Sequence, residues 1–214
     1  MAADRLGDTV YERIREEVLS GALPAGTRLS VPAIAARLDV SRSPVRDAVL
    51  RLTQEGLARE EPRRGAVVAR ITAADLVTLY EVREVLEGLA ARLAVENAGR
   101  RLVDNLADVT RRHEAAVQAS DLAGHFEADT TFHRLIREAG GNPEVCHMLD
   151  RIGGKVRLAM RTTSVTAGPR QALRDHKAIL AAIRKGDPVH AESVARAHIS
   201  RLRTALAAAA EDSR

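Results

Sequence analysis

The chain has 214 residues, which is long for one small domain and comfortable for two, and aromatic residues make up only 2% of it. Its core must be built from Leu, Val, Ile and Ala, which favours helices and counts against single-strand binders that stack bases on aromatic rings. A net charge of +4 is weakly consistent with nucleic-acid binding, and a single cysteine excludes a disulfide framework.

The sequence carries no apolar run of membrane-spanning length and no apolar signal segment at its start. We therefore expect a cytoplasmic protein with no membrane partner.

A first amphipathic helix is predicted over residues 9–19, and turn residues end it. Its buried side is expected to carry Val10, Ile14, Val18 and Leu19.

Residues 41–56 have the pattern of a short amphipathic helix with a cationic first turn. Ser41 can cap the helix, and Pro44 is tolerated in its first turn. Arg42 and Arg46 are four residues apart and share the exposed face, as in a helix that enters the major groove of DNA. The alternative is an ordinary amphipathic helix with solvated arginines. One apolar stripe is formed by Val45, Val49 and Leu52.

The segments on either side of this helix favour the DNA-binding interpretation. Two short strands, residues 57–61 and 66–69, flank a tip that holds Arg64 and Gly65. A compact helix of residues 34–38 precedes the cationic helix after a short turn. Helix, turn, helix and basic hairpin together predict a winged helix-turn-helix.

These residues resemble the N-terminal domain of the GntR family of bacterial transcription regulators, in the segments Val40-Ser41-Arg42-x-Pro44-Val45-Arg46-x-Ala48 and Pro62-Arg63-Arg64-Gly65. The resemblance implies a regulator that binds double-stranded operator DNA. We expect it to bind as a homodimer, because one recognition helix reads only a few base pairs. The chain departs from many relatives at Ser30-Val31-Pro32-Ala33, where they carry polar or charged residues, so we expect that DNA contact to be absent or supplied elsewhere. The implied DNA-binding residues are Ser41, Arg42, Arg46, Arg64 and Gly65.

The rest of the chain is predicted to be an all-α bundle. Residues 71–74 are interpreted as a linker between a domain of residues 1–70 and a domain of residues 75–214. Breaks rich in Gly, Asn, Asp and Pro divide the second domain into six helices with short connections. The first begins at Asp75, and the others are expected at residues 101–119, 121–139, 143–163, 169–185 and 188–210.

Arg83 falls inside the apolar stripe of the first bundle helix. One interpretation is an ion pair with Glu87, one helical turn away. The other is a cation held inside the bundle to receive the carboxylate of a ligand.

Four polar residues occupy positions where the bundle pattern calls for an apolar side chain. Asp129 and His133 are four residues apart on one helix, on a face expected to point inward with Leu122, Phe126 and Ile136. His176 and His198 are equidistant from the turn at Asp187, which places each roughly 16 Å down its own helix. Three histidines and an aspartate converging in a helical core are difficult to neutralise except with a metal.

The remaining histidines match no pattern and are interpreted as surface or filler residues: His113, His125, His147 and His190. Among them, His125 lies four residues before Asp129 and is the one expected nearest to the cluster.

The second half resembles the FCD ligand-binding domain of the FadR-like branch of GntR regulators. The matching residues are Asp129-x-x-Phe132-His133, Gly141-Asn142, His176 and His198. The resemblance implies a divalent metal held by Asp129, His133, His176 and His198, with a small carboxylic-acid effector beside it. Three imidazoles and one carboxylate suit Zn²⁺, Ni²⁺, Co²⁺ or Mn²⁺ better than Mg²⁺ or Ca²⁺.

Two function classes account for these features. The first is a transcription regulator, a repressor or an activator, whose operator binding responds to a small organic acid. The alternative is a metal-dependent hydrolase with an appended DNA-binding domain, because such a site could activate water. No glutamate stands at metalloprotease spacing and no nucleophile motif is present, so we expect a regulator and not an enzyme.

Overall fold

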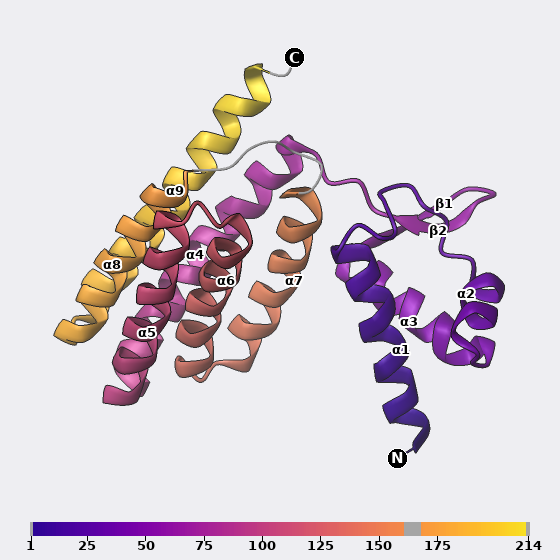
Figure 1. Cartoon of the computed structure of the whole chain (residues 1–214), viewed down its shortest axis with the longest axis horizontal. Helices are drawn as coiled ribbons and strands as arrows, with labels where there is room; N and C mark the ends of the chain where they lie inside the picture. Colours follow the sequence, from indigo (N-terminus) through magenta and orange to yellow (C-terminus); the bar gives the residue numbers. More distant parts are fainter. Residues whose placement is uncertain (1, 161–167, 213–214) are drawn as a thin grey trace. The chain divides into compact units, whose positions relative to one another are not determined.

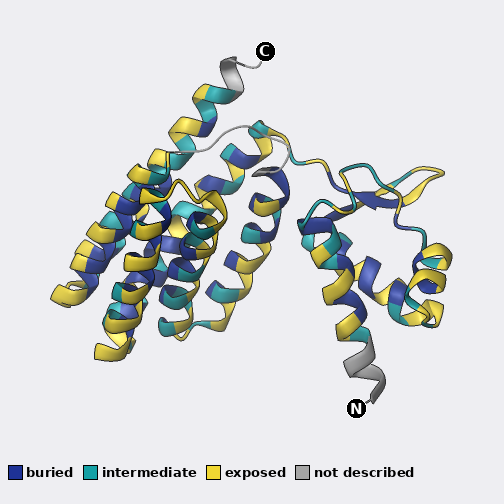
Figure 2. Cartoon of the chain, in the orientation of Figure 1, coloured by how far each residue is buried: buried dark blue, intermediate teal, exposed yellow. Residues whose placement is uncertain are grey.

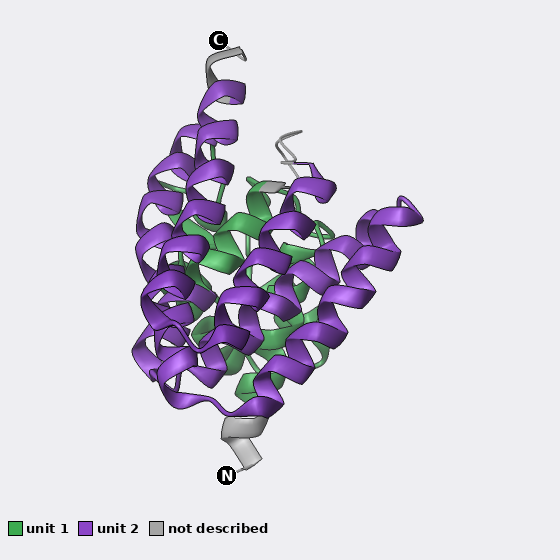
Figure 3. Ribbon diagram, turned by 90° about the vertical axis from the view of Figure 1, so that its left-hand side faces the viewer, with its two compact units in different colours: residues 1–72, 151–164 green, residues 73–150, 165–214 purple. Residues whose placement is uncertain are grey.

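A computed structural model describes residues 2–160 and 168–212, with side chains for residues 7–159 and 168–209 (Figure 1). The chain is mainly helical, with one antiparallel two-stranded hairpin after the third helix, as the sequence predicts. It divides into two compact units, which Figure 3 distinguishes. The first holds the chain up to Thr72 together with the second half of helix α7, from Arg151, and the second holds most of the remaining helices.

Three helices build the core of the first unit: α1 (Ala2–Leu19), α2 (Val31–Leu38) and α3 (Arg42–Glu55). Helix α1 begins earlier than the sequence pattern indicates, but its predicted buried face is confirmed, with Ile14 and Val18 fully buried. Helix α2 begins with the Ser30-Val31-Pro32-Ala33 segment, because Ser30 stands at its N-cap and Pro32 lies in its first turn. Apolar residues from all three helices meet in one cluster.

The hairpin pairs β1 (Ala58–Glu61) with β2 (Gly65–Val68), in a register that sets Ala58 opposite Val68 and Glu61 opposite Gly65. Its inner end is anchored, because Val67 and Val68 are fully buried. Its tip is exposed, and Arg63 and Gly65 there both adopt a positive φ. Glycine tolerates that conformation without the steric cost that a side chain brings, which favours a tight turn at this point.

The second unit contains the long helices α4 (Ala73–Asn97) and α9 (Pro188–Asp212) and, between them in the chain, α5 (Arg100–Gln118), α6 (Leu122–Ala139) and α8 (Pro169–Lys185). Helix α7 (Pro143–Met160) begins in this unit and continues into the first. The predicted helices agree with these bounds to within about two residues at most ends. The last three residues of the helix expected at 143–163 lie outside the described residues.

Helices α4 and α9 approach closely along their length. A Cβ added to Gly88 on α4 would lie 2.5 Å from Cγ of Arg196 on α9, so a larger residue there would displace the Arg196 side chain. The apolar core of the unit is formed by small residues of α4 and by larger ones of α5, α6 and α8, which Figure 2 shows as dark stripes. Burial of such apolar surface is the main source of the unit's stability.

None of the helices in the described part of the chain is long and apolar enough to cross a membrane.

Candidate metal centre and nucleic-acid interface

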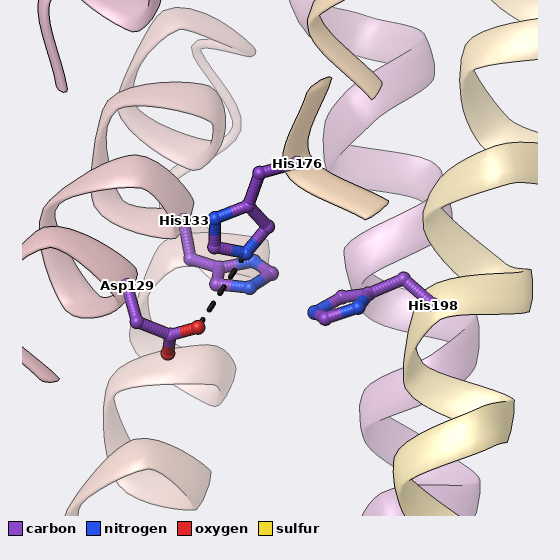
Figure 4. Close-up of side chains that lie close together, drawn as sticks. All are labelled: Asp129, His133, His176 and His198. Atoms are coloured by element: carbon purple, nitrogen blue, oxygen red, sulfur yellow. Dashed lines mark ion pairs between the residues drawn. The ribbon is translucent and has the colours of Figure 1, made fainter. Parts of the chain in front are cut away.

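The bundle brings together the four polar residues that the sequence analysis singles out. Asp129 and His133 project from α6, His176 from α8 and His198 from α9, and Figure 4 shows all four side chains directed at one point. One ligand atom from each lies within 4.8 Å of the others, and Nε2 of His176 is 3.4 Å from Oδ1 of Asp129. The three histidines are buried, while the Asp129 side chain keeps 29% of its surface exposed.

Each of the three histidines uses its Nδ1 atom to bind a buried partner. Nδ1 of His133 lies 3.0 Å from Oε2 of Glu87 on α4. Nδ1 of His198 lies 3.0 Å from Oδ2 of Asp175. For the third, Nδ1 of His176 lies 3.2 Å from Nδ1 of His113 on α5. The carboxylates can only accept, so His133 and His198 donate Nδ1–H and turn Nε2 toward the centre of the cluster. The direction of the bond between His176 and His113 depends on the tautomer of each ring.

The Nε2 atoms of the same three histidines are buried and have no hydrogen-bond partner in the described part of the chain. Buried polar atoms without partners are rare and costly, so three of them around one carboxylate need an explanation. A divalent metal satisfies all three lone pairs at once, and the imidazole and carboxylate ligands match those of transition-metal sites. The residues present therefore fit a metal.

Burial favours the neutral, metal-binding form of two of the histidine rings, His176 and His198. Burial lowers the pKa of His176 well below its ordinary value, and the neighbouring His133 adds to the effect. Burial also lowers the pKa of His198, and the Asp175 carboxylate offsets only part of that shift. A neutral ring carries the free Nε2 lone pair that a metal ligand requires.

The acidic groups around the cluster are held in their charged form. Burial alone would raise the pKa of Glu87, but His133 and Arg83 together lower it to about 2. Burial likewise opposes ionisation of Asp175, whose bonds to His198 and Arg201 lower its pKa to about 2. Partial burial also opposes ionisation of Asp129, but His133 and Arg83 lower its pKa.

Arg83 is largely buried, with a side chain that is 12% exposed. Its Nε donates to Oε1 of Glu87 at 3.1 Å and its Nη1 to the hydroxyl of Tyr80 at 3.1 Å. Burial opposes the charge, but Tyr80 and Glu87 outweigh it and raise the Arg83 pKa. The ion pair that the sequence offers as one interpretation is therefore present, and Nη2 keeps no hydrogen-bond partner among the described residues.

Three expectations about the surroundings of the cluster are wrong. His113 and His125 are not surface or filler residues, since both are buried and bonded to each other. Among the described residues it is His113, and not His125 as expected, that bonds directly to a member of the cluster, His176. Leu122 and Phe126 do not point inward, since they are 57% and 37% exposed. The inward face of α6 passes instead through His125, Ala128, Phe132 and Ile136.

The partners of these histidines were not predicted from the sequence. Glu87 was expected only as a partner of Arg83, and Asp175 was assigned no role. The Phe132 ring, which also went unassigned, stacks on His176 with centroids 4.1 Å apart. The only available signal was position: Asp175 adjoins His176 in the chain and is itself buried.

In the first unit, the predicted buried stripe of α3 is confirmed, with Val45 and Leu52 fully buried. Arg42 and Arg46 are exposed at the N-terminal end of the helix. Ser41 occupies the N-cap position, with extended backbone, but forms no side-chain capping bond. The cationic face of the helix is thus open to a partner.

The hairpin tip holds the other two predicted DNA-binding residues. Nη1 of Arg64 lies 2.6 Å from Oε2 of Glu61, and its Nη2 donates to the carbonyl of Gly26 at 3.2 Å. Gly65 is exposed beside it. Arg64 is therefore held at the base of the tip by Glu61, whereas Arg42 and Arg46 form no ion pair among the described residues.

Two family models match the chain. The model described as bacterial regulatory proteins, gntR family, matches residues 6–68, and the model described as FCD domain matches residues 78–201. The second match spans all four residues of the cluster.

Known proteins are similar to this chain in sequence or in fold, two of them over at least 90% of its length. The Probable D-xylose utilization operon transcriptional repressor of Paenarthrobacter nicotinovorans is 30% identical over 196 residues, which cover 90% of this chain and 86% of that protein. The solved structure of McbR/YncC from E. coli has a TM-score of 0.78 at 22% identity, covering 95% of this chain and 97% of that one. A structure of the metal-free FCD domain of TM0439 has a TM-score of 0.55 at 13% identity, covering 66% of this chain and 97% of that one.

Proposed function

Because the chain belongs to the gntR family of bacterial regulatory proteins and carries an FCD domain, we propose that a small organic acid, bound beside a divalent metal in the bundle, controls its operator binding. It is a DNA-binding transcription regulator. The alternative of a metal-dependent hydrolase is wrong, because the matched families and relatives are regulators and not enzymes. The repressor among the relatives supports repression as the mode of action.

The observation that carries the proposal is the set of three orphaned Nε2 atoms, on His133, His176 and His198, around the Asp129 carboxylate. These four residues hold the metal. Three imidazoles and a carboxylate favour Zn²⁺, Ni²⁺, Co²⁺ or Mn²⁺. A divalent ion held there supplies positive charge and open coordination positions for a carboxylate.

Arg83 receives the carboxylate of the acid. Its guanidinium is mostly removed from water, keeps Nη2 unengaged, and is close enough to Asp129 for each to shift the pKa of the other. A planar guanidinium binds a carboxylate through parallel hydrogen bonds, which favours arginine over lysine at such a position. The bond to Glu87 orients the side chain toward the site.

Arg83→Ala is expected to abolish the response of operator binding to the acid while leaving operator affinity itself unchanged. The reason is that Arg83 lies in the bundle, outside the helix-turn-helix. The measurement is fluorescence anisotropy of labelled operator DNA, titrated with a panel of small mono-, di- and tricarboxylic acids. Arg92→Ala is the matched control, because Arg92 lies on the same helix and forms an exposed pair with Glu96 at the same spacing. An unchanged acid response would leave Arg83 with its structural role beside Glu87.

The same titration tests the proposal as a whole when it is run on metal-loaded and on chelator-treated protein. An acid that releases operator DNA only from the metal-loaded protein is the expected result. Release at equal acid concentration from both forms would contradict control through the metal site.

DNA is bound by a dimer that uses the bundle as its dimerisation module. One recognition helix reads only a few base pairs, so two-fold symmetry is needed for selective binding and implies an inverted-repeat operator. Val82 and Val85 on α4 are each more than half exposed, which supplies apolar surface for a second copy of the chain.

Arg42 and Arg46 contact base edges or nearby phosphates, supported by Ser41 and, at the hairpin tip, by Arg64 and Gly65. Arg46→Ala is expected to weaken operator binding by about 1–3 kcal/mol and to relax selectivity at one base position if Arg46 reads a base. A phosphate contact would weaken all sequences equally and flatten the salt dependence.

The measurement for Arg46→Ala is operator affinity across single-base operator variants and salt concentrations. Arg51→Ala is the control, because Arg51 lies near the other end of α3, where it binds Asp8. Full operator affinity in Arg46→Ala at physiological salt would mean that α3 is not the recognition helix.

A further inference from the structure

Three histidines, His176, His113 and His125, form a hydrogen-bonded row that begins at the proposed metal site. Nδ1 of His176 meets Nδ1 of His113 at 3.2 Å, and Nε2 of His113 meets Nδ1 of His125 at 2.7 Å. His113 and His176 are fully buried, whereas His125 keeps 6% of its surface exposed. Neither His113 nor His125 belongs to the four proposed metal ligands, so the proposed metal site alone does not explain them.

The direction of the hydrogen bonds along this row is set by the state of His176. A neutral imidazole has one N–H donor and one acceptor nitrogen. When Nε2 of His176 ligates a metal, its proton must be on Nδ1, which then donates to Nδ1 of His113. His113 must in turn carry its proton on Nε2 and donate to Nδ1 of His125. All three tautomers are thereby fixed.

The opposite direction is the competing state. With its proton on Nε2, His176 would point an N–H group at Oδ1 of Asp129, 3.4 Å away, and would occupy the place of the metal. His125 would then donate from its Nδ1 to Nε2 of His113, and His113 would donate from its Nδ1 to Nδ1 of His176. The two states differ only in where three protons lie, and only one of them leaves Nε2 of His176 free.

From this geometry we infer that His113, supported by His125, is a positioning residue that accepts the Nδ1–H hydrogen bond of His176, holds its ring in the metal-binding tautomer and thereby raises metal affinity. The inference rests on the proposed metal site. The hydrogen-bond acceptor of a metal-ligating histidine orients the ring and fixes its tautomer, and its loss typically costs 10- to 100-fold in affinity.

The other two histidine ligands, His133 and His198, show why the acceptor beside His176 is a histidine and not a carboxylate. Glu87 and Asp175, which accept from His133 and His198, are each also bound to an arginine, Arg83 and Arg201 respectively. No arginine bonds to His113 in the described part of the chain. A carboxylate in its place would be a buried charge without a compensating cation, which is costly. A neutral histidine can accept the hydrogen bond from Nδ1 of His176 without that cost.

The test is metal affinity of the full-length protein, measured by competition between the protein and a chromophoric chelator for Zn²⁺. His113→Phe keeps a ring but removes both nitrogens, and we expect it to bind Zn²⁺ 10- to 100-fold more weakly than the wild type. His113→Asn places a carbonyl oxygen near the former Nδ1 position, where it can accept from His176, and is expected to recover most of the affinity. His190→Phe, at an exposed histidine on α9, should leave affinity unchanged.

Nitrogen-15 NMR of the histidine rings in the Zn²⁺-loaded wild-type protein provides a second measurement that requires no variant. His113 should carry its proton on Nε2, and His176 on Nδ1. A proton on Nδ1 of His113, or equal Zn²⁺ affinity in the wild type and a folded His113→Phe, would overturn the inference. Absence of Zn²⁺ binding by the wild type would instead overturn the proposed metal site, so the two failures are distinguishable.

Discussion

Addition of Zn²⁺ or Ni²⁺ to the metal-free protein should raise the melting temperature of the bundle by about 10 °C. The four ligands come from α6, α8 and α9 and meet only in the folded state, so binding energy becomes folding energy. Free metal at about 1,000 times its dissociation constant stabilises the folded state by about 4 kcal/mol. For a chain of this size each kcal/mol raises the melting temperature by roughly 2–4 °C.

This shift should disappear in His176→Ala, which removes one orphaned Nε2 and opens the row of histidines. His147→Ala is the matched control, because His147 is exposed on α7 and has no place in the cluster. The shift should also be absent with Mg²⁺, which prefers oxygen ligands. Differential scanning fluorimetry or calorimetry measures it, and equal stabilisation of His176→Ala and wild type would place the metal elsewhere.

Acidification from pH 7 to pH 5 should destabilise the metal-free protein. Burial and the neighbouring His125 lower the pKa of His113 to about 4, and burial lowers the pKa values of His125, His176 and His198 as well. The unfolded chain therefore takes up protons near pH 6.5 that the folded chain takes up only at lower pH. Stability from these groups is complete above pH 6.5 and is lost as the pH falls, by up to about 1.4 kcal/mol per pH unit for each histidine.

The carboxylates of Glu87 and Asp175 do not change the free energy of unfolding between pH 6.5 and pH 5. Glu87 and Asp175, with pKa values near 2 in the folded protein, lose their contribution only below their ordinary carboxyl pKa values, 4.5 for Glu and 3.8 for Asp. The free energy of unfolding, measured by urea titration at several pH values, should therefore fall between pH 6.5 and pH 5. A value that stays constant or increases would mean that these histidines are protonated in the folded state. His190→Ala should leave the profile unchanged.

The helices were predictable because each has a strong periodic pattern and clear ends. The stripe of Val45, Val49 and Leu52 fixes the buried face of α3, and Gly56 adopts the positive φ that ends the helix. The hairpin followed from two short runs around a tip that contains Gly65. Helix α1 was the less accurate case, since its first turn lacks the apolar spacing that would reveal it.

The cluster of Asp129, His133, His176 and His198 was predictable for a different reason: histidines and an aspartate stood where the pattern required apolar residues. Its surroundings were not, because they depend on contacts between helices far apart in the chain. His113 is 63 residues from His176 and follows no pattern that links the two. Glu87 has an obvious partner one turn away in Arg83, which concealed its second bond to His133.

The most direct test of the central claim is the metal content of the protein, purified without an affinity tag or chelators and measured by inductively coupled plasma mass spectrometry. Four converging ligands predict about one transition-metal ion per chain in the wild type and almost none in Asp129→Ala or His176→Ala. A native protein without a stoichiometric transition metal, which also gains no stability from added Zn²⁺ or Ni²⁺, would contradict the claim and leave Asp129, His133, His176 and His198 as a buried polar network.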